Sequence, residues 1–234
     1  MNNIDIIREE ATKLLDKENS GHGMEHVNRV ANIASNIAKK EKANIELATA
    51  IALLHDVDDY KIFGNEYAKN LTNTKNILEK TTFTEEEKNI VISVMKTIGY
   101  SKRLAGIVPQ SLEAKVVSDA DMLDAIGAVG LLRSHQYNIS HNRVFFDKDV
   151  YPELNMDAER YKAKQDGTVV THIFEKMLTL KDLMLTESGK EEALKRHKFI
   201  IEFLKEYFYE IDNKEWMDYL KEYVRKRYIK RRNR

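Results

Sequence analysis

Residues 46–61, ELATAIALLHDVDDYK, run from an apolar segment directly into charged side chains. A helix that is apolar on all sides is usually buried in the middle of a domain, so we expect a central helix over 46–55. A carboxylate directly after a buried helix is costly unless it is paired or coordinated. The imidazole of His55 and the carboxylate of Asp56 are both ligands for divalent transition metals, and both can reach one ion from the last turn of this helix. Asp59 lies three residues further on and returns to the same face.

A second anomaly lies in residues 118–127, SDADMLDAIG, where Asp121 and Asp124 stand three apart in a mostly apolar stretch. Two carboxylates on the inner stripe of a helix need a cation or hydrogen-bond donors nearby. Either Asp119 or Asp121 could supply a further metal ligand. Gly130 continues the three-residue spacing, which would let another part of the backbone come close.

A third stretch, residues 21–30 with the sequence GHGMEHVNRV, places His22 and His26 four residues apart, with Arg29 on the next turn. This spacing puts imidazole and guanidinium groups on one helix face. Two histidines and two carboxylates suit Mn, Ni, Co, Fe or Zn, and are too rich in nitrogen for calcium. Arg29 could bind a phosphate in bidentate fashion, and Lys61 could add a positive charge. A surface role for His22, Arg29 and Lys61 is an equally good interpretation.

The composition favours an all-helical fold. Only Pro109 and Pro152 interrupt long stretches of Ala, Leu, Ile, Glu and Lys, which lose little side-chain entropy in a helix. We expect a compact single-domain helical bundle over residues 1–234. Its motif core would span about 20–135, and C-terminal helices at about 168–230 would pack on it. Apolar periodicity and start signals predict helices near 4–17, 26–38, 46–55, 65–79, 85–98, 111–133, 168–185, 190–209 and 213–229.

Local signals refine this helical prediction. Residues 84–87 and 188–191 have the capping-box spacing that marks a helix start. Residues 134–155 break the helical rhythm, which suits a functional lid and an ordinary surface connection equally well. Residues 144–146, Val-Phe-Phe, are the best candidate for a strand. We interpret His172, in a later helix, as structural.

The charge balance excludes a general attraction to polyanions. The chain has 38 basic and 38 acidic residues, so no global charge draws it to nucleic acid or an anionic membrane. The absence of cysteine excludes disulfides and thiolate chemistry. No apolar run approaches the roughly 20 residues that span a bilayer, and residues 1–5 lack the features of a secretory signal. We therefore expect a cytoplasmic protein without a membrane partner.

The C-terminal tail, residues 225–234, carries seven positive charges. Such a tail could bind nucleic acid through phosphate contacts. Cations also complement the dipole at the end of a solvated helix, and we favour this second interpretation. Nucleic acid is therefore not the expected partner, although the tail leaves it open.

The order of the three motifs resembles the HD-domain phosphohydrolases. The resemblance comprises an H-x-x-R-V opening at 26–30, the His-Asp pair at 55–56 and a D-A-D-x-L-D-A-I-G closing motif at 119–127. It covers about residues 20–135. The most similar branch is that of small bacterial members that act on nucleotides.

This resemblance implies a metal centre and a set of roles. The metal would be one divalent ion, which could be Mn, Ni, Co, Fe, Zn or Mg, and the resemblance implies that its ligands are His26, His55, Asp56 and Asp121. It also implies that the residue three after the HD aspartate, here Asp59, assists catalysis; many members have Glu there. We expect further contributions to catalysis from Arg29 and Lys61, to substrate binding from His22 and Arg133, and to orientation of a ligand from Asp124.

The implied activity is metal-dependent hydrolysis of nucleotides, specifically of nucleoside triphosphate to monophosphate and pyrophosphate. We expect an activated water to attack phosphorus, with Arg29 stabilising the developing charge and Asp59 orienting or deprotonating the water. A nucleoside monophosphatase and a cyclic-nucleotide phosphodiesterase are alternatives within the same enzyme class. An alternative of another class is a nucleic-acid-binding or signalling adaptor that uses the basic tail, 225–234. A homo-oligomer is compatible with either class.

Overall fold

The computed structural model describes residues 2–16, 23–164 and 166–232, and all regular secondary structure in these ranges is helical. The prediction of an all-α fold is therefore confirmed. None of the described helices combines the length and apolar character that crossing a membrane would require. The elements in chain order are α1 (Asn3–Leu15), α2 (Met24–Glu41), α3 (Ile45–Leu54), α4 (Tyr60–Phe63), α5 (Asn65–Asn70), α6 (Thr72–Leu78), α7 (Glu85–Met95), α8 (Tyr100–Leu104), α9 (Leu112–Asp124), α10 (Gly127–Ser140), α11 (Ala158–Ala163), α12 (Val169–Glu175), the 3₁₀-helix η1 (Met177–Leu183), α13 (Glu187–Glu210) and α14 (Lys214–Arg232).

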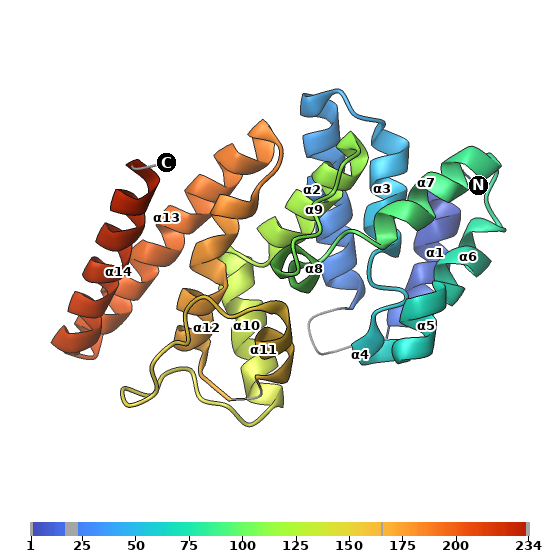
Figure 1. Ribbon diagram of the computed structural model, residues 1–234. Helices are drawn as coiled ribbons and strands as arrows, with labels where there is room; N and C mark the ends of the chain where they lie inside the picture. Colours follow the sequence, from blue (N-terminus) through green and yellow to red (C-terminus); the bar gives the residue numbers. More distant parts are fainter. Residues whose placement is uncertain (1, 17–22, 165, 233–234) are drawn as a thin grey trace.

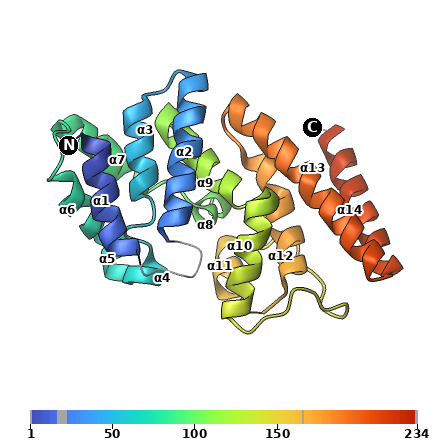
Figure 2. The ribbon, with the colours of Figure 1, turned by 180° about the vertical axis from the view of Figure 1, so that it is seen from behind.

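Helix α3 lies at the centre of the N-terminal half, as its apolar sequence predicts. Ala48, Ala50 and Ala52 are completely buried, and their small side chains let neighbouring helices approach closely. Helices α2 and α9 both pack against α3 and against each other, while α1 and α7 cover other parts of α3 (Figures 1 and 2). The ends of α2, α3 and α9 are thereby brought together.

The C-terminal half continues from this core through α13, which packs against α2, α9, α10 and η1. Helix α14 packs against α13 and forms the outer edge of the molecule (Figure 1). Trp216 of α14 is fully buried, and its indole Nε1 donates to the carbonyl of Lys148 at 3.0 Å. Arg227, from the basic tail, donates to Leu178 O and pairs with Asp182, both at 3.1 Å. This part of the tail therefore has a structural use.

Three predicted helices are interrupted in the structure. The one expected over 65–79 breaks at Leu71, which has a left-handed backbone (φ 53°) and separates α5 from α6. The one expected over 111–133 breaks after α9, where Gly127 adopts φ 81° and starts α10. The one expected over 168–185 is an α-helix only as far as Glu175. It is followed by the 3₁₀-helix η1.

Other local predictions have mixed outcomes. The capping box at 84–87 is present at the start of α7. The prediction of a capping box at 188–191 was wrong, because the residue that caps α13 is Thr186, which accepts a hydrogen bond from Gly189 N. The irregular segment predicted for 134–155 begins later, since α10 continues to Ser140. Residues 144–146 form no strand among the described residues; the carbonyl of Phe145 instead accepts from Val170 N at 3.1 Å.

Candidate metal centre

The site starts at the C-terminal end of α3, where the buried helix stops. His55 is the capping residue, and its ring Nδ1 lies 2.7 Å from the carbonyl oxygen of Ala52. A carbonyl can only accept, so this contact assigns the proton to Nδ1 and leaves a lone pair on Nε2. The following turn is held by Asp58, whose carboxylate accepts from Asn73 N at 2.8 Å and from Thr74 N and Oγ1 at 2.9 and 2.7 Å.

His26, in the first turn of α2, has the same tautomer for a parallel reason. Its Nδ1 lies 2.7 Å from Oδ2 of the buried Asp124, so Nδ1 is the donor and Nε2 carries the lone pair. The two Nε2 atoms of His26 and His55 lie only 3.1 Å apart. Two lone pairs at this separation repel each other unless a cation lies between them. The arrangement therefore favours a bound cation at this point.

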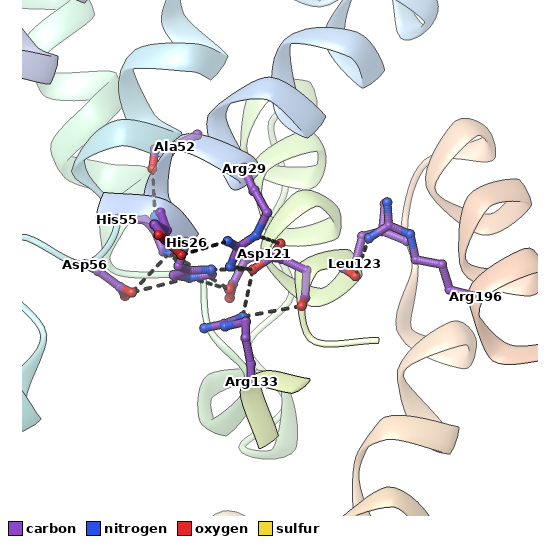
Figure 3. Close-up of polar contacts among 11 residues, drawn as sticks. His26, Arg29, Ala52, His55, Asp56, Asp121, Leu123, Arg133 and Arg196 are labelled. Atoms are coloured by element: carbon purple, nitrogen blue, oxygen red, sulfur yellow. Dashed lines mark hydrogen bonds and ion pairs between the residues drawn. The ribbon is translucent and has the colours of Figure 1, made fainter. Parts of the chain in front are cut away.

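Two carboxylates complete the cluster. Asp56 Oδ2 lies 3.5 Å from His26 Nε2 and 3.4 Å from His55 Nε2. Asp121 Oδ1 lies 3.6 and 3.9 Å from the same two atoms. Figure 3 shows these side chains converging from the ends of α2, α3 and α9.

The donor set fits one divalent metal ion. One ligand atom from each of His26, His55 and Asp56 lies within 4.8 Å of the others. Neutral imidazole nitrogens with carboxylate oxygens suit first-row transition metals. The electrostatics agree: burial lowers the pKa of His55, but the charges of Asp56 and Asp121, together with the hydrogen bond to Ala52, raise it above its usual value. The cluster thus attracts positive charge.

Asp124 lies behind His26 and accepts hydrogen bonds from three side chains. Besides His26, Arg29 donates from Nε at 2.8 Å and Nη2 at 3.1 Å, and Arg133 donates from Nη1 at 2.9 Å. Burial alone would raise the pKa of Asp124, but the bonds from His26 and Arg29 hold it well below its usual range. Asp124 is therefore an anion that fixes the ring of His26 in place. Arg29 directs two of its donors at this carboxylate, so the guanidinium is engaged within the protein.

The corner between α9 and α10 keeps Asp121 and Asp124 in position. Arg196 of α13 donates from Nη1 to Leu123 O at 2.7 Å, near the C-terminal end of α9 (Figure 3). A Cβ atom added to Gly130 would come within 2.4 Å of the backbone carbonyl of Ala125. The close approach expected at Gly130 therefore exists, and it is to the preceding turn of the same chain.

The cluster opens onto a cavity of about 360 Å³, which Asp56 and Asp121 both line. Asp59, Lys61 and Arg133 line it as well, as the sequence analysis expected of residues near the substrate. Asp59 caps α4 through a bond from Lys61 N to its Oδ1, at 2.8 Å. The cationic residues of the lining are Lys61, Arg133, Arg143, Lys162, Lys164 and Lys176.

Asp119, the other candidate metal ligand from the sequence, does not join the cluster. His22 lies outside the described residues. Asp119 is completely buried and accepts from the backbone of Leu185 and from the N–H and hydroxyl of Thr186, at 2.7 to 3.1 Å. It fastens α9 to the start of α13, and the alternative that it ligates the metal loses its support.

The structure also adds cavity residues that the sequence analysis did not identify. His172 lines the cavity, and burial together with the charges of Lys176 and Arg143 lowers its pKa to about 3. It is therefore neutral at physiological pH. Lys176 follows α12 and lines the same wall. Nothing in the spacing of residues 156–177 indicates that they meet motifs more than 30 residues away.

Comparisons with known proteins agree with this geometry. Residues 23–126 match the model of the HD domain family. Bacillus subtilis YpgQ is 30% identical over 201 residues, covering 86% of this chain and 89% of YpgQ. The crystal structure of YpgQ in complex with ADP superposes with a TM-score of 0.70 and 27% identity, over 90% of this chain and 96% of YpgQ.

Two other solved structures are similar over nearly the whole chain. A protein from Lactobacillus plantarum has a TM-score of 0.78 and 33% identity, covering 90% of this chain and 97% of its own. An HD-superfamily hydrolase from Bacillus thuringiensis has a TM-score of 0.68 and 29% identity, covering 90% and 97%. With the His-Asp pair of α3 at the centre of its site, the chain belongs to the HD domain family and is a metal-dependent phosphohydrolase.

Proposed function

We propose that this enzyme hydrolyses nucleoside triphosphates to the monophosphate and pyrophosphate, with one divalent ion held by His26, His55, Asp56 and Asp121. The proposal depends mainly on how closely these four side chains approach one another. The Nε2 atoms of His26 and His55 lie 3.1 Å apart, and one oxygen of Asp56 and one of Asp121 each lie within 3.9 Å of both nitrogens, at the edge of a cavity lined with cations. A divalent ion in such a site polarises a phosphoryl oxygen and lowers the pKa of water.

Asp59 is the proposed general base. One of its oxygens accepts from Lys61 N, and the other can accept a proton from the attacking water. Asp59 lines the cavity, which supports this role. A carboxylate can act as a general base when it lies within hydrogen-bond distance of the attacking water. Lys61 contributes positive charge to the same wall.

Arg133 and Arg29 have different proposed roles. Arg133 lines the cavity and stabilises negative charge on the phosphoryl group. Arg29 holds Asp124, which in turn holds His26, so its effect on catalysis is through the position of the metal ligand. This structural role of Arg29 replaces the bidentate contact between Arg29 and a phosphate that was expected from the sequence.

The nucleotide substrate is supported by charge and by similarity. Omitting Asp56 and Asp121, the cavity is lined by six cations and by three carboxylates, Asp59, Asp166 and Glu175. This excess of positive charge favours a polyanion. The related YpgQ has been crystallised with ADP, which is consistent with a nucleotide in the equivalent cavity.

A substrate screen tests the proposal. Nucleoside triphosphates, nucleoside monophosphates and cyclic nucleotides are incubated with Mn²⁺, Ni²⁺, Co²⁺ or Mg²⁺, and orthophosphate and pyrophosphate are detected separately. We expect pyrophosphate and nucleoside monophosphate in equal amounts. Orthophosphate released from nucleoside monophosphates alone, or opening of cyclic nucleotides alone, would contradict the proposal.

The control for this screen is the double variant His55→Ala with Asp56→Ala. It removes two of the four proposed ligands, so turnover is expected to fall to background. Asp119→Asn is a matched control, because it alters a buried carboxylate of α9 that bonds only to the start of α13 in the contacts described above. Turnover in the double variant equal to wild type would reject the assigned metal centre.

A further inference from the structure

Lys176 is held in the cavity wall by two aromatic rings. Its Nζ lies 4.9 Å from the ring centroid of Tyr100 and 5.8 Å from that of Tyr161. These rings meet edge to face with centroids 4.9 Å apart. A cation over an aromatic face is attracted by the ring quadrupole, so α8 and α11 fix the position of the ammonium group.

No carboxylate in the described part of the chain pairs with Lys176. Other cations of the lining do have such a partner: Lys164 lies 2.6 Å from Glu175, and Arg133 lies 2.9 Å from Asp124. Burial lowers the pKa of Lys176 to about 8, although the charge of Asp121 acts to raise it. Lys176 is half-buried, and a cation that is partly withdrawn from water without a partner anion is costly. A bound anion would remove that cost.

The surroundings of His172 show that positive charge gathers on this wall. After burial, the charges that lower the pKa of His172 come from four cations, Lys176, Arg143, Lys61 and Lys164. Asp121 and Lys176 interact electrostatically and line the same cavity. An anion bound by Lys176 would therefore share the cavity with the proposed metal centre.

We propose that Lys176, braced by Tyr100 and Tyr161, binds a phosphate group of the substrate other than the one attacked at the metal centre. The inference rests on the proposed function and adds a specificity determinant to it. We expect a ligand with two linked phosphates to contact the metal centre and Lys176 together, and a single phosphate to contact only one of them. Lys176 thus selects substrates with at least two linked phosphates.

Equilibrium binding tests this inference without turnover. The Mn²⁺-loaded full-length chain is titrated calorimetrically with methylenediphosphonate, a non-hydrolysable diphosphate analogue, and separately with orthophosphate. The variants are Lys176→Met, Lys176→Arg and the matched control Lys69→Met, which alters an exposed lysine of α5 that is not among the residues lining the cavity. The Mn²⁺ concentration is the same throughout, so chelation by the analogue affects all proteins equally.

We expect Lys176→Met to weaken methylenediphosphonate binding about 10- to 100-fold, as loss of a charge-assisted contact does. Orthophosphate and Mn²⁺ affinities should change less than about threefold, Lys176→Arg should recover most of the loss, and Lys69→Met should match wild type. Steady-state kinetics on the nucleotide found in the screen should show a raised KM with kcat less affected. If Lys176→Met lowers the Tm, the same comparison is made with Lys176→Gln.

Two results would overturn the inference. One is wild-type affinity of Lys176→Met for methylenediphosphonate. The other is an equal loss for orthophosphate and the diphosphonate, which would indicate a structural role for Lys176. Either result with a positive nucleotide screen rejects only the role of Lys176. A negative nucleotide screen with the expected binding result rejects the proposed substrate and leaves the diphosphate contact in place.

Discussion

Asp124→Asn is expected to weaken metal binding, although Asp124 is not one of the four proposed metal ligands. The buried carboxylate accepts two bonds from Arg29, one from Arg133 and one from His26. An asparagine of the same shape keeps one accepting oxygen and turns an N–H₂ group toward these donors. The ring of His26 then loses the contact that fixes its tautomer, and such changes typically weaken metal binding about 10- to 100-fold.

The same substitution should also lower stability. Leaving one member of a buried ion pair alone costs about 3–5 kcal/mol. The side chains of Arg29 and Arg133 are 33% and 19% exposed, so water compensates part of this, and we expect about 2–4 kcal/mol. Urea unfolding of the metal-free protein measures this free energy, and calorimetric titration with Mn²⁺ measures the affinity.

Asp119→Asn is the control for Asp124→Asn. It changes a carboxylate of the same helix that is equally buried but bonds to Leu185 and Thr186. We expect it to destabilise the fold while Mn²⁺ affinity stays near the wild-type value. Wild-type Mn²⁺ affinity in Asp124→Asn, or an equal loss in Asp119→Asn, would show that Asp124 does not hold His26 in place for the metal.

Three more outcomes follow from the described contacts. Gly130→Ala should destabilise the protein by about 1–3 kcal/mol, measured by urea unfolding, because its Cβ would meet the carbonyl of Ala125 at 2.4 Å. In the folded protein the pKa of His172 is lowered to about 3, whereas in the unfolded chain it is about 6.5. Between these two pH values the unfolded chain binds a proton at His172 that the folded protein does not. The free energy of unfolding therefore falls as the pH drops. From pH 7.5 to 5.5 the wild type should lose about 1.4 kcal/mol more than His172→Gln; equal losses would contradict this assignment. Mn²⁺ at 100 times its Kd should stabilise the wild type by about 2.7 kcal/mol, or about 5–11 °C in Tm, and His55→Ala should abolish this shift.

Part of the site could be predicted from local sequence alone. His55 and Asp56 follow directly after an apolar run, so their position at the end of a buried helix needs only the pattern of residues 46–56. The choice of Asp121 over Asp119 as the carboxylate near this pair came instead from the resemblance to HD-domain phosphohydrolases, and the structure has Asp121 Oδ1 3.9 Å from His55 Nε2. The capping box at 84–87 was likewise a purely local signal.

Contacts between distant segments could not be predicted in this way. Arg29 and Asp124 are 95 residues apart, so the periodicity of α2 gives no sign that its arginine bonds to a carboxylate of α9. The same holds for Arg196 and Leu123, 73 residues apart. The break at Leu71 was missed because leucine favours helices and rarely adopts a positive φ; packing overrides that preference here.

The position of a bound metal ion shows whether His26, His55, Asp56 and Asp121 hold it together. A crystal of this protein soaked in Mn²⁺ and measured at a wavelength where manganese scatters anomalously would locate it. We expect one anomalous peak between the Nε2 atoms of His26 and His55 and the carboxylates of Asp56 and Asp121. A peak bound by other residues, or none in a crystal of protein that binds Mn²⁺ in solution, would contradict it.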